Sequence, residues 1–141
     1  MITATLSLLL FTIFTILSGF HFYWFFGGKW ALEKVIPTKK QQIKNITIPK
    51  YATLLVALIL LFFGVLYLFL SKLTPFQLTN NMVKYMYWCI PILFIIRAIG
   101  DFYYVGFFKK IKRTKFAIAD TKLFSPLCLI IGILGIITLL N

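Results

Sequence analysis

The chain has 141 residues, of which 61% are hydrophobic, and 15 Lys and Arg against 3 Asp and Glu give it a net charge of +12. The length fits one domain, and the hydrophobic fraction is far above that of soluble globular domains, so an ordinary soluble fold is excluded. The composition therefore predicts segments that cross a membrane. Such helices need about 20 predominantly apolar residues.

Four segments are long and apolar enough to span a bilayer. In chain order they cover residues 4–26, 51–70, 85–108 and 123–140. Only the third contains charged residues, Arg97 and Asp101. The first has no basic n-region and no small-residue cleavage site, so we interpret it as a helix rather than a secretory signal. The sequence predicts an all-α fold, an integral membrane bundle of four transmembrane helices in a single domain over residues 1–141.

Basic residues are concentrated in the loops 29–50 and 109–122, whereas only Lys72 and Lys84 flank the loop between the second and third segments. Short basic loops remain cytoplasmic, so we expect both termini outside the cell. Lysine also far outnumbers arginine, which is typical of bacteria with AT-rich genomes. We therefore expect a multi-pass protein of the bacterial cytoplasmic membrane whose loops contact anionic lipid headgroups.

The high positive charge is split over loops that flank the membrane, so we expect no nucleic-acid partner. The chain has no CxxC, His–Cys or HExxH pattern, which predicts no metal site, and we expect no cofactor.

The charges of the third segment oppose its insertion. A central Arg or Asp costs about 2.5–3.5 kcal/mol, and the apolar residues of this segment return only about 3–7 kcal/mol in total. A compensating partner is therefore expected. Arg97 and Asp101 are spaced i to i+4, so we predict an intramembrane ion pair between them, supplemented by partners on other helices, with Tyr104 and Phe108 on the same helix face.

Polar residues of separate segments are expected at similar depths. His21 and Asp101 each lie eight residues before a lysine, Lys29 and Lys109, which places both about 12 Å below the cytoplasmic boundary. Arg97 is expected about 18 Å deep and Ser125 about 5 Å deep. Glu33 and Asp120 fall just outside the membrane on the same side. We infer that the acids, the one histidine and Arg97 converge near the cytoplasm.

Two interpretations of this convergence remain open. The polar residues either hold the helices together or line a cytoplasm-facing cavity between the first, third and fourth segments that binds or transports a small anionic or amphipathic molecule, such as a lipid. The expected ligand-binding residues are His21, Tyr23, Trp24, Arg97, Asp101, Tyr104, Asp120 and Ser125.

Two alternative functions also remain. A membrane-embedded enzyme would use His21 and Asp101 as its catalytic acid and base. Ser125 precedes a proline, which favours a helix cap over a nucleophile. An accessory subunit would bind another membrane protein, or a second copy of the chain, through small-residue seams such as that of Ser125, Cys128, Gly132 and Gly135.

Two blocks of sequence resemble a known family. They are "HFYWFFGG" (His21–Gly28) and "RAIGDFYYVGFFKKIKRTKFAIADTKLFSPLC" (Arg97–Cys128), and they are similar to the hallmarks of the small bacterial membrane proteins of domain of unknown function family 3995. The chain departs from the family pattern at Tyr103, where arginine is frequent, and at Phe124, where tyrosine is usual. The resemblance implies a four-helix membrane architecture and assigns no activity.

Overall fold

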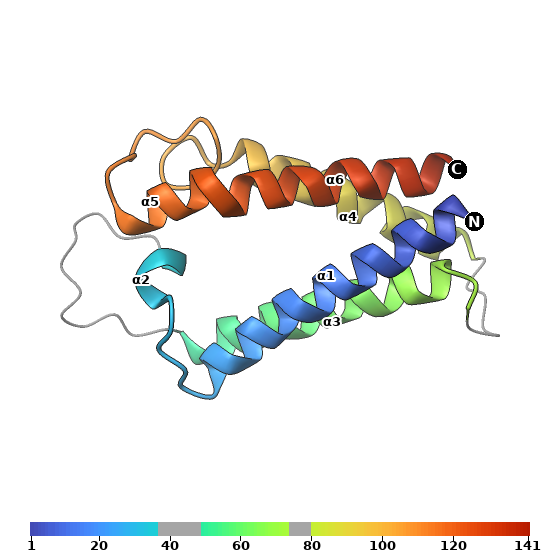
Figure 1. The fold of residues 1–141 in the computed structure, drawn as a ribbon, viewed down its shortest axis with the longest axis horizontal. Coiled ribbons are helices and arrows are strands. Elements are labelled where there is room, and N and C mark those ends of the chain that lie inside the picture. Colours follow the sequence, from blue (N-terminus) through green and yellow to red (C-terminus); the bar gives the residue numbers. More distant parts are fainter. Residues whose placement is uncertain (37–48, 74–79) are drawn as a thin grey trace. The chain divides into compact units, whose positions relative to one another are not determined.

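The computed structural model describes residues 1–36, 49–73 and 80–141, and every regular element in these ranges is helical (Figure 1). The elements are α1 (Ile2–Phe25), α2 (Leu32–Val35), α3 (Lys50–Leu70), α4 (Asn81–Ile99), α5 (Lys115–Ala119), the π-helical turn η1 (Asp120–Phe124) and α6 (Ser125–Leu140). The predicted all-α fold is confirmed. Part of the predicted basic loop 29–50, residues 37–48, lies outside the described residues.

Four helices of the described chain are long and apolar enough to cross a membrane. They are α1, α3, α4 and the continuous helix Lys115–Leu140, which joins α5, η1 and α6. Many of their large apolar side chains are exposed, such as Leu55 and Phe62 of α3. A surface of this kind suits lipid and not water. The chain is therefore a multi-pass membrane protein, while the outward orientation of its termini stays a prediction.

The chain divides into two compact units, each described here by itself. The first comprises the described residues of 1–28, 49–90 and 134–141, and the second those of 29–36 and 91–133. Helices α4 and α6 each contribute to both units.

The first unit is built around the pairing of α1 with α3, which lie side by side (Figure 1). Ser18 Oγ donates a 2.8 Å hydrogen bond to the Ala57 carbonyl oxygen, and the Phe14 ring stacks on Tyr67 at 5.8 Å between ring centroids. Gly64 faces Phe14 so closely that a Cβ at this position would lie 3.3 Å from the Phe14 Cβ. Small and large residues thus alternate along a tight helix interface.

Two tyrosines of the first unit differ in how their hydroxyl groups are satisfied. Tyr87 of α4 donates a 3.0 Å hydrogen bond to the Leu66 carbonyl oxygen of α3. The Tyr67 hydroxyl is fully buried, and no group of the described residues accepts from it or donates to it. The first hydroxyl links two helices, whereas the second bears an uncompensated desolvation cost.

The second unit contains the end of α4, the helix α5–η1–α6 and the short α2. Helices α4 and α6 approach closely at Gly132, where a Cβ would lie 2.5 Å from Ile95 Cγ1 and 3.1 Å from the Pro91 carbonyl oxygen. Lys115 of α5 forms an ion pair with Glu33 of α2. These contacts hold together the helices that position the polar cluster around Asp120.

Two predicted helix boundaries are wrong. The third helix ends at Ile99 and not at residue 108, and the fourth begins at Lys115 and not at residue 123. Residues 115–122, which were predicted to belong to a basic loop, are therefore helical. The third helix ends early because a glycine-dependent turn follows Ile99. Hydropathy does not detect this turn, because the turn is itself rich in aromatic residues.

Candidate functional site

The segment 100–114, called the returning segment below, folds back on the end of α4. Gly100 and Gly106 adopt positive φ angles of +90° and +92°, which glycine adopts without a Cβ penalty. Their backbones touch, because a Cβ built on either glycine would overlap the backbone around the other. Phe107 N donates a 3.0 Å hydrogen bond to the Ala98 carbonyl oxygen, which satisfies one of the free acceptors at the helix end. The two glycines therefore terminate α4 and return the chain alongside it.

Asp101 organises the first turn of this segment. Its Oδ1 atom accepts hydrogen bonds from the backbone N–H groups of Tyr103 at 2.9 Å, Tyr104 at 2.7 Å and Val105 at 2.9 Å. These bonds, led by that of Val105, lower the pKa of the Asp101 carboxyl group below its usual value. Asp101 is exposed and ionised at neutral pH, and its local role is that of a turn cap.

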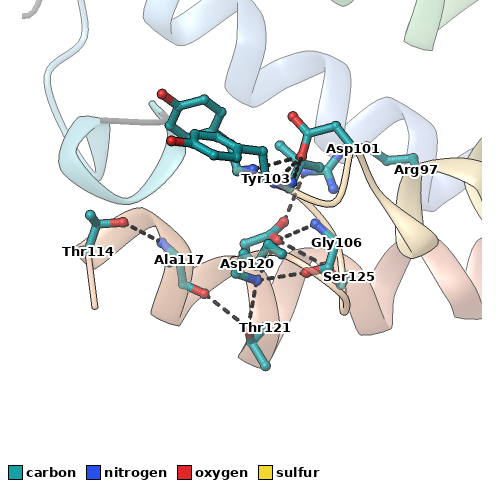
Figure 2. A network of polar contacts seen from close by, with 12 residues as sticks. Arg97, Asp101, Tyr103, Gly106, Thr114, Ala117, Asp120, Thr121 and Ser125 are labelled. Atoms are coloured by element: carbon teal, nitrogen blue, oxygen red, sulfur yellow. Dashed lines mark hydrogen bonds and ion pairs between the residues drawn. The ribbon is translucent and has the colours of Figure 1, made fainter. Parts of the chain in front are cut away.

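Asp120 is the centre of the polar cluster shown in Figure 2. It is completely buried in the π-helical turn, which places its carboxylate between the end of α4 and the returning segment. Arg97 Nη2 lies 3.0 Å from Oδ1. Oδ2 accepts from Gly106 N at 2.8 Å, from Lys109 Nζ at 2.9 Å and from Ser125 Oγ at 3.2 Å. One carboxylate therefore joins α4, the returning segment and the start of α6.

Lys109 is buried to the same degree, with only 1% of its side chain exposed. Besides Asp120, its Nζ atom donates to the Gly106 carbonyl oxygen at 2.9 Å and to Thr121 Oγ1 at 2.7 Å. All three donors of the ammonium group thus have acceptors. Nearby, Thr114 caps α5 by accepting from Ala117 N at 3.1 Å. Through Asp120 and Thr121, Lys109 thus binds the returning segment to the helix Lys115–Leu140.

Arg97 is the incompletely satisfied member of the cluster. Its Nη2 atom is bound to Asp120, but its Nη1 atom is buried with no hydrogen-bond partner among the described residues. A third of the side chain, 33%, remains exposed. Arg97 and Lys109 share a single carboxylate, so the cluster carries one positive charge in excess. Because Lys109 is fully coordinated, that excess is concentrated at Arg97.

The predicted ion pair between Arg97 and Asp101 is wrong in its acidic partner. It assumed that the helix continues past residue 101, which would place the two side chains one turn apart. Because α4 ends at Ile99, Asp101 binds backbone N–H groups and Arg97 pairs with Asp120. The shared helix face predicted for Tyr104 and Phe108 is wrong for the same reason. The Tyr104 ring instead packs edge-on against Tyr103, with 4.7 Å between ring centroids.

Three further predicted site residues lie in the first unit, near the end of α1. His21 Nδ1 lies 2.8 Å from the Leu17 carbonyl oxygen, and its ring packs edge-on against Trp24 at 5.2 Å. The Tyr23 ring covers Gly28, where a Cβ would overlap it. The predicted meeting of these residues with Arg97 stays a prediction.

The structure thus brings together three predicted residues, Arg97, Asp120 and Ser125, and adds Lys109, Gly106 and Thr121. Sequence reasoning used Lys109 only as a marker of the membrane boundary, because lysine is rarely buried. A signal for the added residues was present, since all three belong to the sequence block that resembles the family.

The cluster is suited to electrostatic binding and not to nucleophilic chemistry. Ser125 is completely buried, so it lacks access, and the carboxylate to which its hydroxyl group donates, Asp120, is a weak base because two cations are paired with it. Arg97, by contrast, is a fixed cation with a side chain that is 33% exposed, and its unpaired Nη1 atom is buried. Such a group binds carboxylate or phosphate oxygens.

A family model described as "Protein of unknown function (DUF3995)" matches residues 14–135 and so includes both blocks, His21–Gly28 and Arg97–Cys128. No curated protein and no solved structure matches the chain.

Proposed function

Because the chain belongs to the DUF3995 family, whose description assigns no activity, we propose its function from its own residues. It is a multi-pass protein of the bacterial cytoplasmic membrane that binds or transports a small anionic or amphipathic molecule near the cytoplasmic side. Arg97 at the end of α4 supplies the positive charge that attracts the ligand.

The charge balance around Asp120 carries this proposal. Two cations share one carboxylate, and the donors on Arg97 Nη1 have no acceptor among the described residues. A stranded donor on a charged group costs at least about 1–3 kcal/mol. An anion bound at the exposed third of the Arg97 side chain would neutralise the excess charge, whereas the Nη1 atom itself is buried.

The enzyme alternative is less well supported by the geometry. Asp101 was expected to form an acid/base pair with His21, but its carboxylate is held by three backbone N–H groups and its pKa is lowered, so it is a weak base. The accessory-subunit alternative relied on small-residue seams. At Gly132 that seam is occupied within the chain by Ile95 and Pro91.

The proposal is tested by native mass spectrometry of anions bound to the purified protein. The Arg97→Gln variant removes the charge and should weaken anion binding by at least tenfold, which corresponds to the loss of about 1.4 kcal/mol or more. Lys84→Gln is the matched control, because it removes an exposed charge from the same helix. Equal anion binding by wild type and Arg97→Gln would refute the proposal.

A further inference from the structure

We infer that the anion bound at Arg97 is the phosphate of an anionic membrane phospholipid. This inference rests on the proposed function and specifies its ligand class. Free phosphate and a lipid headgroup present the same oxygens to a guanidinium, so the surroundings of Arg97 must distinguish between them.

The surroundings on α4 are those of a lipid-facing helix end. Arg97 lies two residues before the end of the membrane-spanning helix Asn81–Ile99. Leu93, one turn earlier on the same face, is 52% exposed, and Ile96 is 62% exposed. Arg97, with a side chain that is 33% exposed, therefore has exposed apolar side chains of α4 as its neighbours in the helix. Acyl chains can cover these side chains, whereas a small hydrophilic anion gains nothing from them.

The segment that follows α4 has the composition of a membrane interface. Phe102 and Phe108 are 58% and 67% exposed. Exposed basic residues follow them in the chain, namely Lys110, Lys112 and Arg113. Aromatic side chains favour the headgroup level of a bilayer, and lysine and arginine attract anionic headgroups. Arg97 thus lies between an acyl-facing helix surface and a headgroup-facing segment, which is where a lipid phosphate resides.

The cluster also orients the guanidinium for such a ligand. Asp120 holds Nη2 at 3.0 Å, and Lys109 together with Gly106 N holds Asp120. Asp120 and Lys109 are therefore positioning residues that limit the rotation of Arg97. A phosphate oxygen can accept from those N–H donors of Arg97 that are exposed, in the plane that guanidinium favours.

The test measures binding of three probes to the full-length protein by native mass spectrometry. The probes are phosphatidylglycerol, phosphatidylcholine and inorganic phosphate. We expect phosphatidylglycerol to bind wild type at least about tenfold more tightly than Arg97→Gln, with Lys84→Gln unchanged. Phosphatidylcholine, in which the choline cation offsets the phosphate charge, should bind wild type more weakly than phosphatidylglycerol, and inorganic phosphate should not displace phosphatidylglycerol.

Each other outcome overturns a defined part of the argument. Binding of inorganic phosphate that depends on Arg97, without a preference for phosphatidylglycerol, would refute the lipid class and leave the proposed function standing. Absence of any anion binding that depends on Arg97 would refute both. Phosphatidylglycerol binding that survives Arg97→Gln but is lost on substitution of Lys110, Lys112 and Arg113 to glutamine would show nonspecific surface attraction and refute the site.

Arg97→Lys serves as a second variant should Arg97→Gln fail to fold. It keeps the charge that pairs with Asp120 but lacks the planar fork. If a phosphate contacts the fork, this variant binds phosphatidylglycerol several-fold more weakly than wild type. Unchanged affinity would refute the contact.

Discussion

Arg97 Nη2 lies 3.0 Å from Asp120 Oδ1, so an arginine near the end of α4 is paired with an acid 23 positions later in the chain. The pair crosses from one helix to another and encloses the segment between them. Its acidic member is completely buried, and that acid also binds the buried Lys109. The stability of the returning segment therefore depends on the Asp120 carboxylate.

Asp120→Asn should destabilise the protein strongly. Removing one partner of a buried ion pair costs about 3–5 kcal/mol, because the charge left behind is uncompensated, and here two cations lose the same partner. Thermal unfolding in detergent, followed by size-exclusion chromatography, measures the effect. Asp101→Asn is the control and should cost much less, since asparagine keeps an acceptor oxygen for the turn. Equal melting temperatures for the two variants would contradict the assignment of Asp120 as the partner of Arg97.

The pKa of Asp101 predicts a specific pH dependence. Backbone N–H groups lower this pKa in the folded protein, so the unfolded chain binds the proton more readily. The resulting stabilisation is complete above the ordinary value of 3.8 and disappears as the pH falls through the lower folded-state value. The gap in melting temperature between wild type and Asp101→Asn should therefore be constant at neutral pH and narrow below 3.8. If the difference in melting temperature widened on acidification, folding would have to raise the pKa of Asp101, and the proposed role of Asp101 as a turn cap would be refuted.

Gly100→Ala and Gly106→Ala should each destabilise the returning segment. Both glycines have positive φ angles, which cost alanine about 1–2 kcal/mol, and a Cβ at either site overlaps neighbouring backbone. Gly19→Ala is the matched control, because a Cβ there meets nothing within 4 Å and alanine favours a helix interior by up to about 1 kcal/mol. Chemical denaturation of the three variants in mixed micelles gives the comparison. A stable Gly106→Ala protein would show that the two backbones do not touch.

Two tyrosine-to-phenylalanine substitutions should change the free energy of unfolding in opposite directions. Tyr87→Phe loses the hydrogen bond to the Leu66 carbonyl oxygen and should cost about 0.5–1.5 kcal/mol. Tyr67→Phe removes a buried hydroxyl group with no partner among the described residues and should stabilise by roughly 1 kcal/mol. Tyr85→Phe, at a side chain 70% exposed, should be neutral. Unfolding free energies from the same micelle titration decide the matter, and loss of stability in Tyr67→Phe would reveal a partner for that hydroxyl.

The basic segments predict that both termini face outward. Alkaline phosphatase fused after Asn141 should be active in cells, and green fluorescent protein fused there should be dark. Fusions truncated within residues 37–48 should give the reverse pattern. A fluorescent fusion at Asn141 would invert the topology and place Arg97 at the opposite membrane surface.

Hydropathy predicted the spans well where the chain is uniformly apolar, as in α1 and α3. It failed after Ile99, because the aromatic residues that follow, Phe102, Tyr103 and Phe108, give this segment the hydropathy of a membrane helix. The turn depends instead on the backbone freedom of Gly100 and Gly106, which hydropathy does not measure. The same error carried into the site. Once the helix was assumed to continue, Asp101 became the apparent partner of Arg97, and the true partner, Asp120, was assigned to the membrane surface.

The π-helical turn at Asp120–Phe124 makes the spacing of residues here as important as their identity. Ser125 N donates to the Asp120 carbonyl oxygen five residues back, so this turn contains one residue more than an α-helical turn. Deleting one residue between 121 and 124 would allow a regular α-helix and leave its hydropathy intact. The deletion would also swing everything before it by about 100° about the helix axis, carrying the carboxylate away from both cations. Homologues that keep the acid are therefore expected to tolerate substitutions in this turn far better than changes in its length.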